Sequence, residues 1–337
     1  MNMNMSNKVI IIILNWNGWQ DTIKCLESIN RNNYSKYNVI VVDNASHDES
    51  VIQIEEYIQK VKNIKKSAAD ITLIKNNKNY GFAGGNNIGI RRVINSTNSK
   101  YILLLNNDTT VDKNFLDELV KLAEADETIG SVQSVLLKPG GTIIDSIGQE
   151  LTTWSARDIE MGSKYEEFND NREIFGACAA SALYRRSVLE DVGLFDEDFF
   201  VMYEDVDLSW RIRLSGYKSL LAANSIVYHH RNVSKSVFEI QIFDWLKNDL
   251  KLYHLTKNML ILAIRYHSSS FLLNPEYLLK LFLTFSLCSY YSLRARRVHK
   301  TFKILKKNLK CRKSFQTNPR LSKLQKRWIR GKDLIIE

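Results

Sequence analysis

The first hundred residues alternate between short aliphatic runs and stretches with helical periodicity. Continuous apolar runs at Val9–Leu14, Val39–Val42 and Tyr101–Leu105 are typical of strands covered on both faces, and Ile71–Ile74 is predicted to be a further strand. Between the runs, apolar residues recur every three or four positions, as they do from Trp19 to Ile29. This alternation predicts an α/β domain with a doubly wound, mostly parallel sheet and right-handed crossovers.

The regular pattern weakens after Asp108. Ser131 to Leu137 and Thr142 to Ile147 are predicted to be two further strands, separated by a turn at Pro139-Gly140-Gly141. Residues Trp154 to Glu173 are charged and show no period, which indicates either a loop over a site or an ordinary surface excursion.

Beyond about Val237 the pattern is helical. We therefore expect an α/β domain at 1–236, a helical extension at 237–293 and a basic tail at 294–337. The uninterrupted apolar stretch Leu281 to Leu293 is shorter than the roughly 20 residues of a spanning helix. It is interpreted as a membrane-interfacial amphipathic element, and a buried helix that closes the core is the alternative.

The net charge of +10 comes from the C-terminal segment. Arg294 to Lys332 contains 16 of the 47 Lys and Arg residues and no Asp or Glu, whereas the first 293 residues carry 31 basic and 35 acidic side chains. Such a block is typical of a contact with anionic lipid head groups or nucleic acid, or of a solvated helical face. Because no nucleic-acid-binding module is recognisable, the segment 271–332 is predicted to bind an anionic membrane surface and no nucleic-acid partner is expected.

The N-terminal segment indicates a cytoplasmic protein. Met1 to Lys8 is polar, and the Val9–Leu14 run is too short for the apolar region of a signal peptide. The four cysteines show neither metal-ligand spacing nor a disulfide framework, which is typical of a reducing compartment. With the basic segment, this predicts a peripheral protein on the inner face of the cell membrane.

Carboxylates follow two of the predicted strands. Asp43 ends the second strand, and Asn106-Asn107-Asp108 ends the fourth. Open α/β sheets bind ligands at the carboxyl ends of their strands, so Asp43 could accept a hydrogen bond from a nucleoside base or ribose. Its alternative role is that of a helix N-cap or Asx-turn residue.

Two further segments could bind a diphosphate and a cation. The glycine-rich loop Asn79 to Asn87 precedes a helix, where backbone N–H groups can approach a phosphate, although such turns are common. Asp108, an amide oxygen and two phosphate groups could complete the shell of Mg²⁺ or Mn²⁺. One of His229 and His230 could add a nitrogen ligand, which would favour Mn²⁺, or could be an ordinary surface or core residue.

Glu204-Asp205 lies among aromatic residues, namely Phe199, Phe200, Tyr203 and Trp210. Partial desolvation would raise a carboxylate pKa toward a value useful for taking a proton from an alcohol. Asp207 and Arg211 are spaced i,i+4 and are expected to pair, so Asp207 is interpreted as structural and Asp205 as the general base.

In this order, the segments resemble the family 2 glycosyltransferases, and within them the bacterial rhamnosyltransferase-like branch. The resemblance extends from Val9 to about Ser234. The matching segments are Leu14-Asn15-Trp16-Asn17, Val41 to Ser46, Asn79 to Asn87, Leu104 to Asp108, Gly193 to Glu197 and Tyr203 to Leu208, with a weaker match at Tyr253 to Asn258.

This resemblance implies a GT-A fold and single-displacement, inverting transfer of a sugar, with rhamnose as a candidate, from a nucleotide-diphospho-sugar to a glycan or lipid-linked acceptor in cell-surface polysaccharide synthesis. Asn106 replaces the first acid of the family's D-x-D motif, which weakens the expected affinity for the cation. The implied catalytic residues are Asp205 and Glu204, the metal ligands are Asp108 and His229, and the donor contacts are Asn15, Asn17, Asp43, Asn79, Gly84, Gly85, Asn87 and Asn107.

Two other classes of protein could share this scaffold. A nucleotidyltransferase would need a basic, glycine-rich loop after the first strand, where this chain has Asn15-Trp16-Asn17-Gly18. A non-catalytic glycan- or lipid-binding protein would not need both Asp108 and Asp205.

Overall fold

The computed structural model describes residues 9–64, 69–152, 154–231, 249–268, 271 and 273–330. The expected domain boundary at 236–237 and the end of the expected membrane-binding segment, residues 331 and 332, lie outside the described residues.

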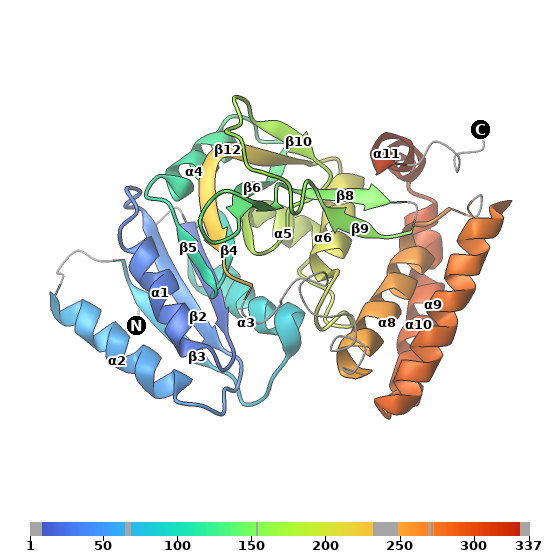
Figure 1. Cartoon of the computed structure of the whole chain (residues 1–337), viewed down its shortest axis with the longest axis horizontal. Helices are drawn as coiled ribbons and strands as arrows, with labels where there is room; N and C mark the ends of the chain where they lie inside the picture. Colours follow the sequence, from blue (N-terminus) through green and yellow to red (C-terminus); the bar gives the residue numbers. More distant parts are fainter. Residues whose placement is uncertain are drawn as a thin grey trace.

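A ten-stranded mixed sheet forms the centre of the molecule (Figure 1). Its main order is β10-β12-β6-β11-β4-β1-β2-β3, with β5 paired to β12 and β7 paired to β6. β3, β2, β1 and β4 are parallel to one another, and β11 is antiparallel to both of its neighbours. The prediction of a mostly parallel α/β sheet is therefore confirmed. The strands are β1 (Val9–Asn15), β2 (Tyr37–Asp43), β3 (Ile71–Lys75), β4 (Tyr101–Asn106), β5 (Thr109–Val111), β6 (Ile129–Leu137), β7 (Ile144–Ser146), β10 (Arg172–Ile174), β11 (Ser181–Arg185) and β12 (Lys218–His229).

Helices cover both faces of this sheet. Because successive strand residues point to opposite faces, Ile11 lies in one core cluster and Ile12 in another. The first core is closed by α1 (Trp19–Ile29), α2 (Ser50–Ile64) and α4 (Phe115–Glu124). The second is closed by α3 (Gly81–Ser96), α5 (Arg186–Val192) and α6 (Glu204–Leu214). The runs in β2 and β4 and nearly all of the run in β1 are buried for this reason, whereas the run in β3, at the edge of the sheet, is mostly half-buried.

A second, three-stranded sheet lies beside the central one. It is ordered β13-β8-β9 and comprises β8 (Gln149–Thr152), β9 (Ala156–Asp158) and β13 (Ile329–Arg330). The segment 154–173, which showed no period in the sequence, therefore contains β9 and enters β10. Its strands are three residues long, too short for an alternating pattern to be visible.

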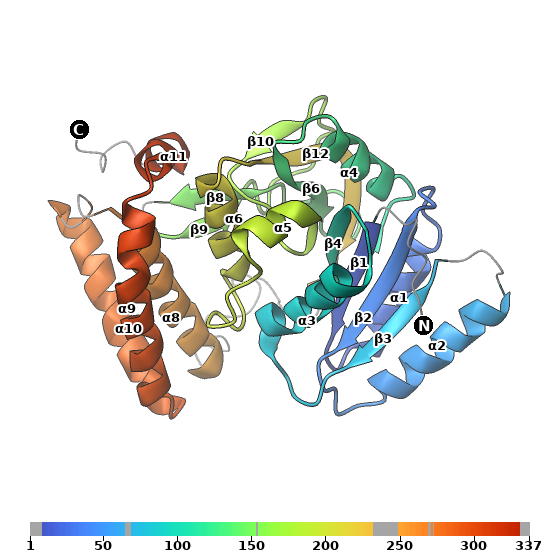
Figure 2. The same ribbon diagram turned by 180° about the vertical axis from the view of Figure 1, so that it is seen from behind.

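The C-terminal helices pack against one another beside the sheet and its flanking helices (Figures 1 and 2). They are α8 (Asp249–Tyr266), α9 (Pro275–Arg294), α10 (Val298–Gln316) and α11 (Arg320–Trp328). Within the expected basic tail, Ile304, Leu321 and Ile329 are buried in a core cluster shared with α6 and α8. Between these apolar positions, the basic residues occupy the outer helix faces.

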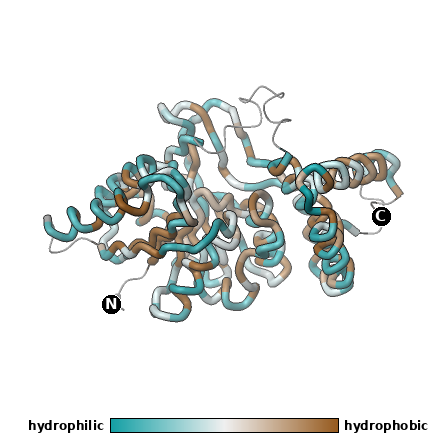
Figure 3. The backbone as a smooth tube through the Cα atoms, turned by 90° about the horizontal axis from the view of Figure 1, so that it is seen from below, coloured by the Kyte–Doolittle hydropathy of each residue, from teal (hydrophilic) through white to brown (hydrophobic). Residues whose placement is uncertain are grey.

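One helix exposes an unusually apolar surface. α9 buries Tyr277, Thr284 and Cys288, while Phe282, Tyr290 and other large apolar side chains face outward. Figure 3 shows hydrophobic positions recurring along the helices that project from the sheet. Across the part of the chain that the structure describes, no helix is long and apolar enough to cross a membrane.

Candidate active site

A chain of polar side chains joins the ends of three parallel strands. β1 pairs with β2 and β4 in a register that places Asn15 beside Asp43 and Leu14 beside Asn106. Asn15 Nδ2 donates to Asp43 Oδ2 at 2.8 Å, and Thr22 Oγ1 donates to Asn15 Oδ1 at 2.8 Å. Asn107 Nδ2 donates to Thr22 Oγ1 at 3.1 Å. The structure therefore brings Asn15, Asp43 and Asn107 together at one edge of the sheet, next to Asp108.

The Asp43 carboxylate stabilises the loop that follows β2. It is buried and accepts from Ser46 N at 3.0 Å and Ser46 Oγ at 2.6 Å. Asn17 Oδ1 accepts from His47 N at 2.8 Å and fixes the same loop. These contacts agree with the alternative role of Asp43, that of an Asx-turn residue. A nucleoside contact by Asp43 or Asn17 stays a prediction.

The glycine-rich segment forms the start of α3 and packs closely on its neighbours. A Cβ on Gly85 would stand 2.5 Å from Leu14 Cδ1, and one on Gly84 would stand 2.9 Å from Tyr80 Cβ. Asn79 Oδ1 accepts from Gly81 N at 2.7 Å and so closes the turn before the helix. Close packing thus explains both glycines, and their predicted contact with phosphate stays a prediction.

Asn87 fixes a segment that is distant in sequence. Its buried side-chain amide donates to Phe195 O at 2.9 Å and Glu197 Oε1 at 3.1 Å, and its Oδ1 accepts from Phe195 N at 3.1 Å. The amide therefore joins α3 to the segment Gly193–Glu197. This contact gives Asn87 a structural role.

His229, at the end of β12, lies between two carboxylates. Its Nε2 is 3.3 Å from Asp108 Oδ1, and its Nδ1 is 2.8 Å from Asp145 Oδ2. Burial alone would lower the pKa of His229, but the hydrogen bonds to Asp108 and Asp145 raise it to about 9. His230 is exposed and contacts Asp108 only through its backbone N–H. Of the two histidines, His229 is thus the one that faces the site.

Asp108 and His229 present a donor set that fits a divalent cation shared with a ligand. Asp145 accepts from His229 Nδ1, which is the usual arrangement of a metal-binding histidine and its supporting carboxylate, and a cation at Nε2 would take the place of the proton that faces Asp108. Within the described ranges, no group of three His, Cys, Asp or Glu residues could hold a metal ion by itself. The remaining positions would therefore need oxygen atoms from a bound ligand.

Glu204 and Asp205 begin α6, where the helix N-terminus favours negative charge. Asp205 Oδ2 accepts from Ala179 N at 3.2 Å and its Oδ1 from Val206 N at 2.8 Å. Burial raises the pKa of both carboxyls, and the two backbone donors partly offset this effect for Asp205. Glu204 Oε2 is buried and has no partner among the described residues. Asp205 is therefore the member of the pair that ionises first.

Asp205 lies close to the strand ends because of β11. Ala179, its backbone donor, precedes Ala180, whose carbonyl accepts from Asn106 N at 3.0 Å. Asp205 and the Asn106–Asp108 segment therefore share one edge of the sheet. The expected pairing of Asp207 with Arg211 is confirmed at 2.9 Å.

The sequence did not predict a row of charged side chains, Asp145, Arg231 and Asp158, that form ion pairs with one another. Arg231 Nε is 2.5 Å from Asp145 Oδ1, and Arg231 Nη2 is 3.5 Å from Asp158 Oδ2. The negative charge of Asp158 in turn contributes to the raised pKa of Asp205. Asp145 and Asp158 lie in segments with no recognisable motif, so only the fold brings them to the site.

Asn258, on α8, holds the turn that precedes Glu204 and Asp205. Its Nδ2 donates to the carbonyls of Phe199, Val201 and Met202 at 3.0, 2.8 and 2.7 Å. The His254 ring stacks on Phe200 with centroids 4.8 Å apart. The only sequence signal for these residues was the weak match at Tyr253 to Asn258.

Comparisons with known proteins identify relatives of this chain. The model of the family described as Glycosyl transferase family 2 matches residues 9–193. The low-salt glycan biosynthesis hexosyltransferase Agl10 of Haloferax volcanii is 25% identical over 239 residues, which are 70% of this chain and 71% of Agl10. The O-antigen biosynthesis protein RfbC of Myxococcus xanthus is 31% identical over 154 residues, 43% of this chain and 12% of RfbC.

Solved structures share the fold at low sequence identity. The mannosyltransferase PcManGT from Pyrobaculum calidifontis, in complex with GDP-Man and Mn²⁺, has a TM-score of 0.54 at 16% identity and covers 96% of this chain and 88% of its own. GalNAc-T7 with UDP, GalNAc and Mn²⁺ has a TM-score of 0.58 at 15% identity, over 79% of this chain and 49% of its own.

Proposed function

The chain belongs to glycosyl transferase family 2, and on that premise we propose that it transfers a sugar from a nucleotide-diphospho-sugar to a hydroxyl of a glycan or lipid-linked acceptor, with inversion at the anomeric carbon. One observation carries the proposal. A carboxylate with a raised pKa, Asp205, shares a sheet edge with the paired Asp108 and His229. A base and a cation-binding pair in one place suit the activation of an alcohol opposite a diphosphate leaving group.

Asp205 removes the proton of the acceptor hydroxyl as the hydroxyl oxygen attacks the anomeric carbon. The bond from that carbon to the diphosphate breaks on the opposite face, and the diphosphate leaves with the electron pair, so that no covalent enzyme intermediate forms. General base catalysis of this kind contributes about 10²- to 10⁴-fold to the rate. Glu204, which keeps its proton at higher pH, spares Asp205 a second neighbouring negative charge.

Asp108 and His229 would hold Mg²⁺ or Mn²⁺, which supplies neutralisation of the charge that develops on the leaving diphosphate. The two similar structures that contain Mn²⁺ support a divalent ion here. Asn15, Asn17, Asp43 and Asn107 form the polar edge on which the nucleoside would lie. Asn79, just before α3, and Gly84, Gly85 and Asn87 within α3 support that edge.

We also propose that the enzyme works in glycan assembly at the inner face of the cell membrane. The names of the glycan-biosynthesis relatives support the first part. The exposed apolar side chains of α9 and the basic residues of α10 and α11 support the second. Rhamnose stays one candidate among the donor sugars.

The proposal is tested with a panel of UDP-, GDP- and dTDP-sugars, with release of the nucleoside diphosphate as the measurement. We expect the wild type to turn over at least one donor, and Asp205→Asn to reduce that rate by about 10²- to 10⁴-fold. A thermal-shift titration should show unchanged donor binding in this variant.

Asp126→Asn is the matched control, because Asp126 lies at the surface, paired with Lys218. Turnover of no donor by the wild type would refute the function, and full turnover by Asp205→Asn would refute the role of the base.

A further inference from the structure

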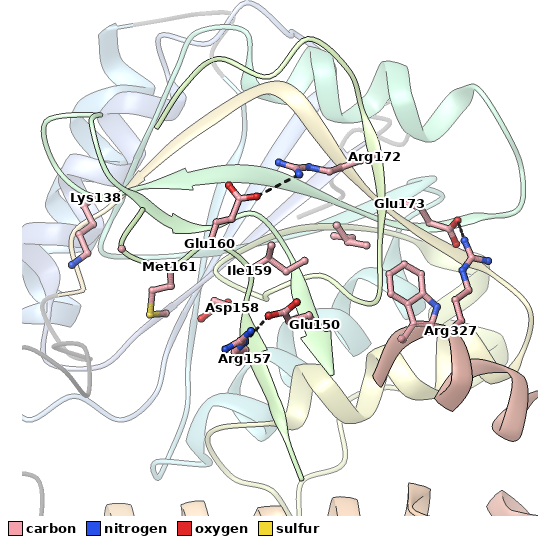
Figure 4. Close-up of a pocket in the computed structure, with 13 residues that line it drawn as sticks. Lys138, Glu150, Arg157, Asp158, Ile159, Glu160, Met161, Arg172, Glu173 and Arg327 are labelled. Carbon is pink, nitrogen blue, oxygen red and sulfur yellow. Dashed lines mark hydrogen bonds and ion pairs between the residues drawn. The ribbon is translucent and has the colours of Figure 1, made fainter. Parts of the chain in front are cut away.

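A cavity of about 980 Å³ is lined mainly by residues of the β8–β9 and β10 region. Its walls come from the β8–β9 hairpin, the segment after β9, the start of β10 and the end of α11 (Figure 4). This volume is at the upper end of the range for small-molecule sites, about 300–1,000 Å³. The cavity can therefore hold a ligand of several rings.

The charges that line the cavity are balanced. Three basic residues pair with three acids across its wall: Arg157 with Glu150 at 2.5 Å, Arg172 with Glu160 at 3.6 Å, and Arg327 with Glu173 at 2.5 Å. Lys138 and Asp158 complete a lining of four positive and four negative groups. A phosphate-bearing ligand would call for an excess of positive charge. Balanced pairs instead offer both donors and acceptors to an uncharged polyol.

Two hydrogen-bond donors at the cavity are unsatisfied. Arg172 Nη2 and Trp328 Nε1 are buried without a hydrogen-bond partner among the described residues. Figure 4 shows Arg172 pointing toward Glu160. A buried donor without a partner is unfavourable, because it has lost its hydrogen bonds to water. Ligand hydroxyl groups would relieve this, and Ile159, Met161 and the Trp328 ring supply the apolar surface that the C–H faces of sugars need.

Asp158 links the cavity to the catalytic carboxylate. It lines the cavity, and its negative charge acts on Asp205. A chain of sugar residues in the cavity would therefore reach the base past Asp158. Gln149, at the start of β8, hydrogen-bonds to Asp205 and precedes Glu150, which lines the cavity.

We propose that this cavity binds uncharged sugar residues of the acceptor glycan and directs the terminal hydroxyl toward Asp205. The inference rests on the proposed transfer function and adds where the acceptor binds and what class of acceptor it is, a neutral oligosaccharide longer than one residue.

The test measures binding of methyl glycosides of mannose, rhamnose, galactose and N-acetylglucosamine, each as a mono- and a tetrasaccharide, by saturation-transfer NMR. Met161→Trp fills the cavity, and Met161→Ala is its matched control because it leaves the space open. Arg172→Gln removes the unpaired donor, with Lys218→Gln as the control at an exposed ion pair elsewhere. Nucleoside diphosphate release from the donor without acceptor is measured in parallel.

We expect at least one tetrasaccharide to bind about tenfold more tightly than its monosaccharide. Met161→Trp and Arg172→Gln should each weaken tetrasaccharide binding about tenfold, with donor hydrolysis unchanged and neither control affected. Equal binding of mono- and tetrasaccharides, or unchanged binding in both cavity variants, would overturn the inference. Absence of donor turnover in the wild type would instead refute the proposed function, so the two failures are distinguishable.

Discussion

Asp205 and Glu204 are neighbours at the start of α6 but have different surroundings. Glu204 is buried, with one oxygen lacking any partner in the described part of the chain, whereas Asp205 is partly exposed and accepts from two backbone N–H groups. Adjacent residues on a helix point in different directions. Two identical functional groups therefore take different protonation states at one pH.

The first prediction concerns the dependence of kcat on pH. Because burial raises the pKa of Asp205 above the ordinary 3.8 and its deprotonated form is the base, activity should fall with decreasing pH through that raised value. We expect kcat, measured between pH 4 and 8, to show a rising limb centred well above pH 3.8. A limb centred at an ordinary aspartate value would contradict the effect of burial. Circular dichroism at each pH separates this limb from unfolding.

The second prediction concerns Asp145, which orients His229 through Nδ1. Asp145→Asn keeps the shape of the side chain but removes its charge. Loss of such a supporting carboxylate weakens metal affinity by about 10- to 100-fold. We expect the Mn²⁺ concentration at half-maximal activity to increase by that factor, and Asp126→Asn to leave it unchanged. An unaltered Mn²⁺ dependence would exclude this role for Asp145.

At the scale of elements, the turn between α5 and α6 is the most constrained segment of the site. Phe200, Met202 and Tyr203 all have left-handed backbone angles, with φ of 66°, 70° and 67°. Such conformations cost on the order of 1–3 kcal/mol each for residues other than glycine. Ala83 N donates to Phe200 O at 3.1 Å, and Asn258 binds three further carbonyls. Contacts from α3 and α8 thus hold a strained turn that presents Asp205.

The third prediction tests Asn258 as a positioning residue. Asn258→Ala removes the donor to three carbonyls, so the turn should relax and kcat should fall about tenfold or more, with little change in the KM for the donor. Unfolding stability should also fall, by about 1–3 kcal/mol.

Asn308→Ala is the control for that experiment, because Asn308 is an equally buried amide on α10 that bonds within its helix and to Arg265. It should lose stability but keep kcat. An equal fall in kcat in both variants would show that Asn258 acts through stability alone.

The sequence predicted those elements whose hydrophobic pattern is visible within a few neighbouring residues. Val9–Leu14 is recognisable as a strand because every residue in it is apolar, and its burial on both faces follows. Asp205 was identified from a motif of adjacent residues. Asp145, Asp158 and Asn258 act through contacts with residues more than 50 positions away, and no local period encodes such contacts.

For the whole molecule, the helices α8 to α11 form an assembly beside the catalytic domain. Its outer layer combines the exposed apolar residues of α9 with a basic α10. The basic block was predicted from the sequence, but not its packing, because the buried Ile304 and Leu321 are spaced too widely among lysines to stand out. Apolar and cationic groups on one assembly suit the surface of an anionic bilayer.

The fourth prediction concerns that surface. The double variant Phe282→Ser and Tyr290→Ser, at side chains 66% and 53% exposed, should lose most co-sedimentation with phosphatidylglycerol vesicles. Binding by the wild type should also weaken with added salt, since the basic residues contribute through screened charge. Ile52→Ser, at a residue 57% exposed on α2, is the control and should bind like the wild type. Equal binding by all three proteins would place the contact elsewhere.

The pairing of β13 with β8 sets an order of events during translation. Arg327 and Glu173, which meet across the cavity wall, are 154 positions apart in the chain. At roughly 5–20 residues per second, a ribosome needs about 8–30 s to synthesise that interval. The strand ends around Asp43 and Asp108 leave the exit tunnel long before Trp328 does. A nascent chain can therefore assemble the sheet edge around Asp43 and Asp108 while the cavity wall at Arg327 is still being made.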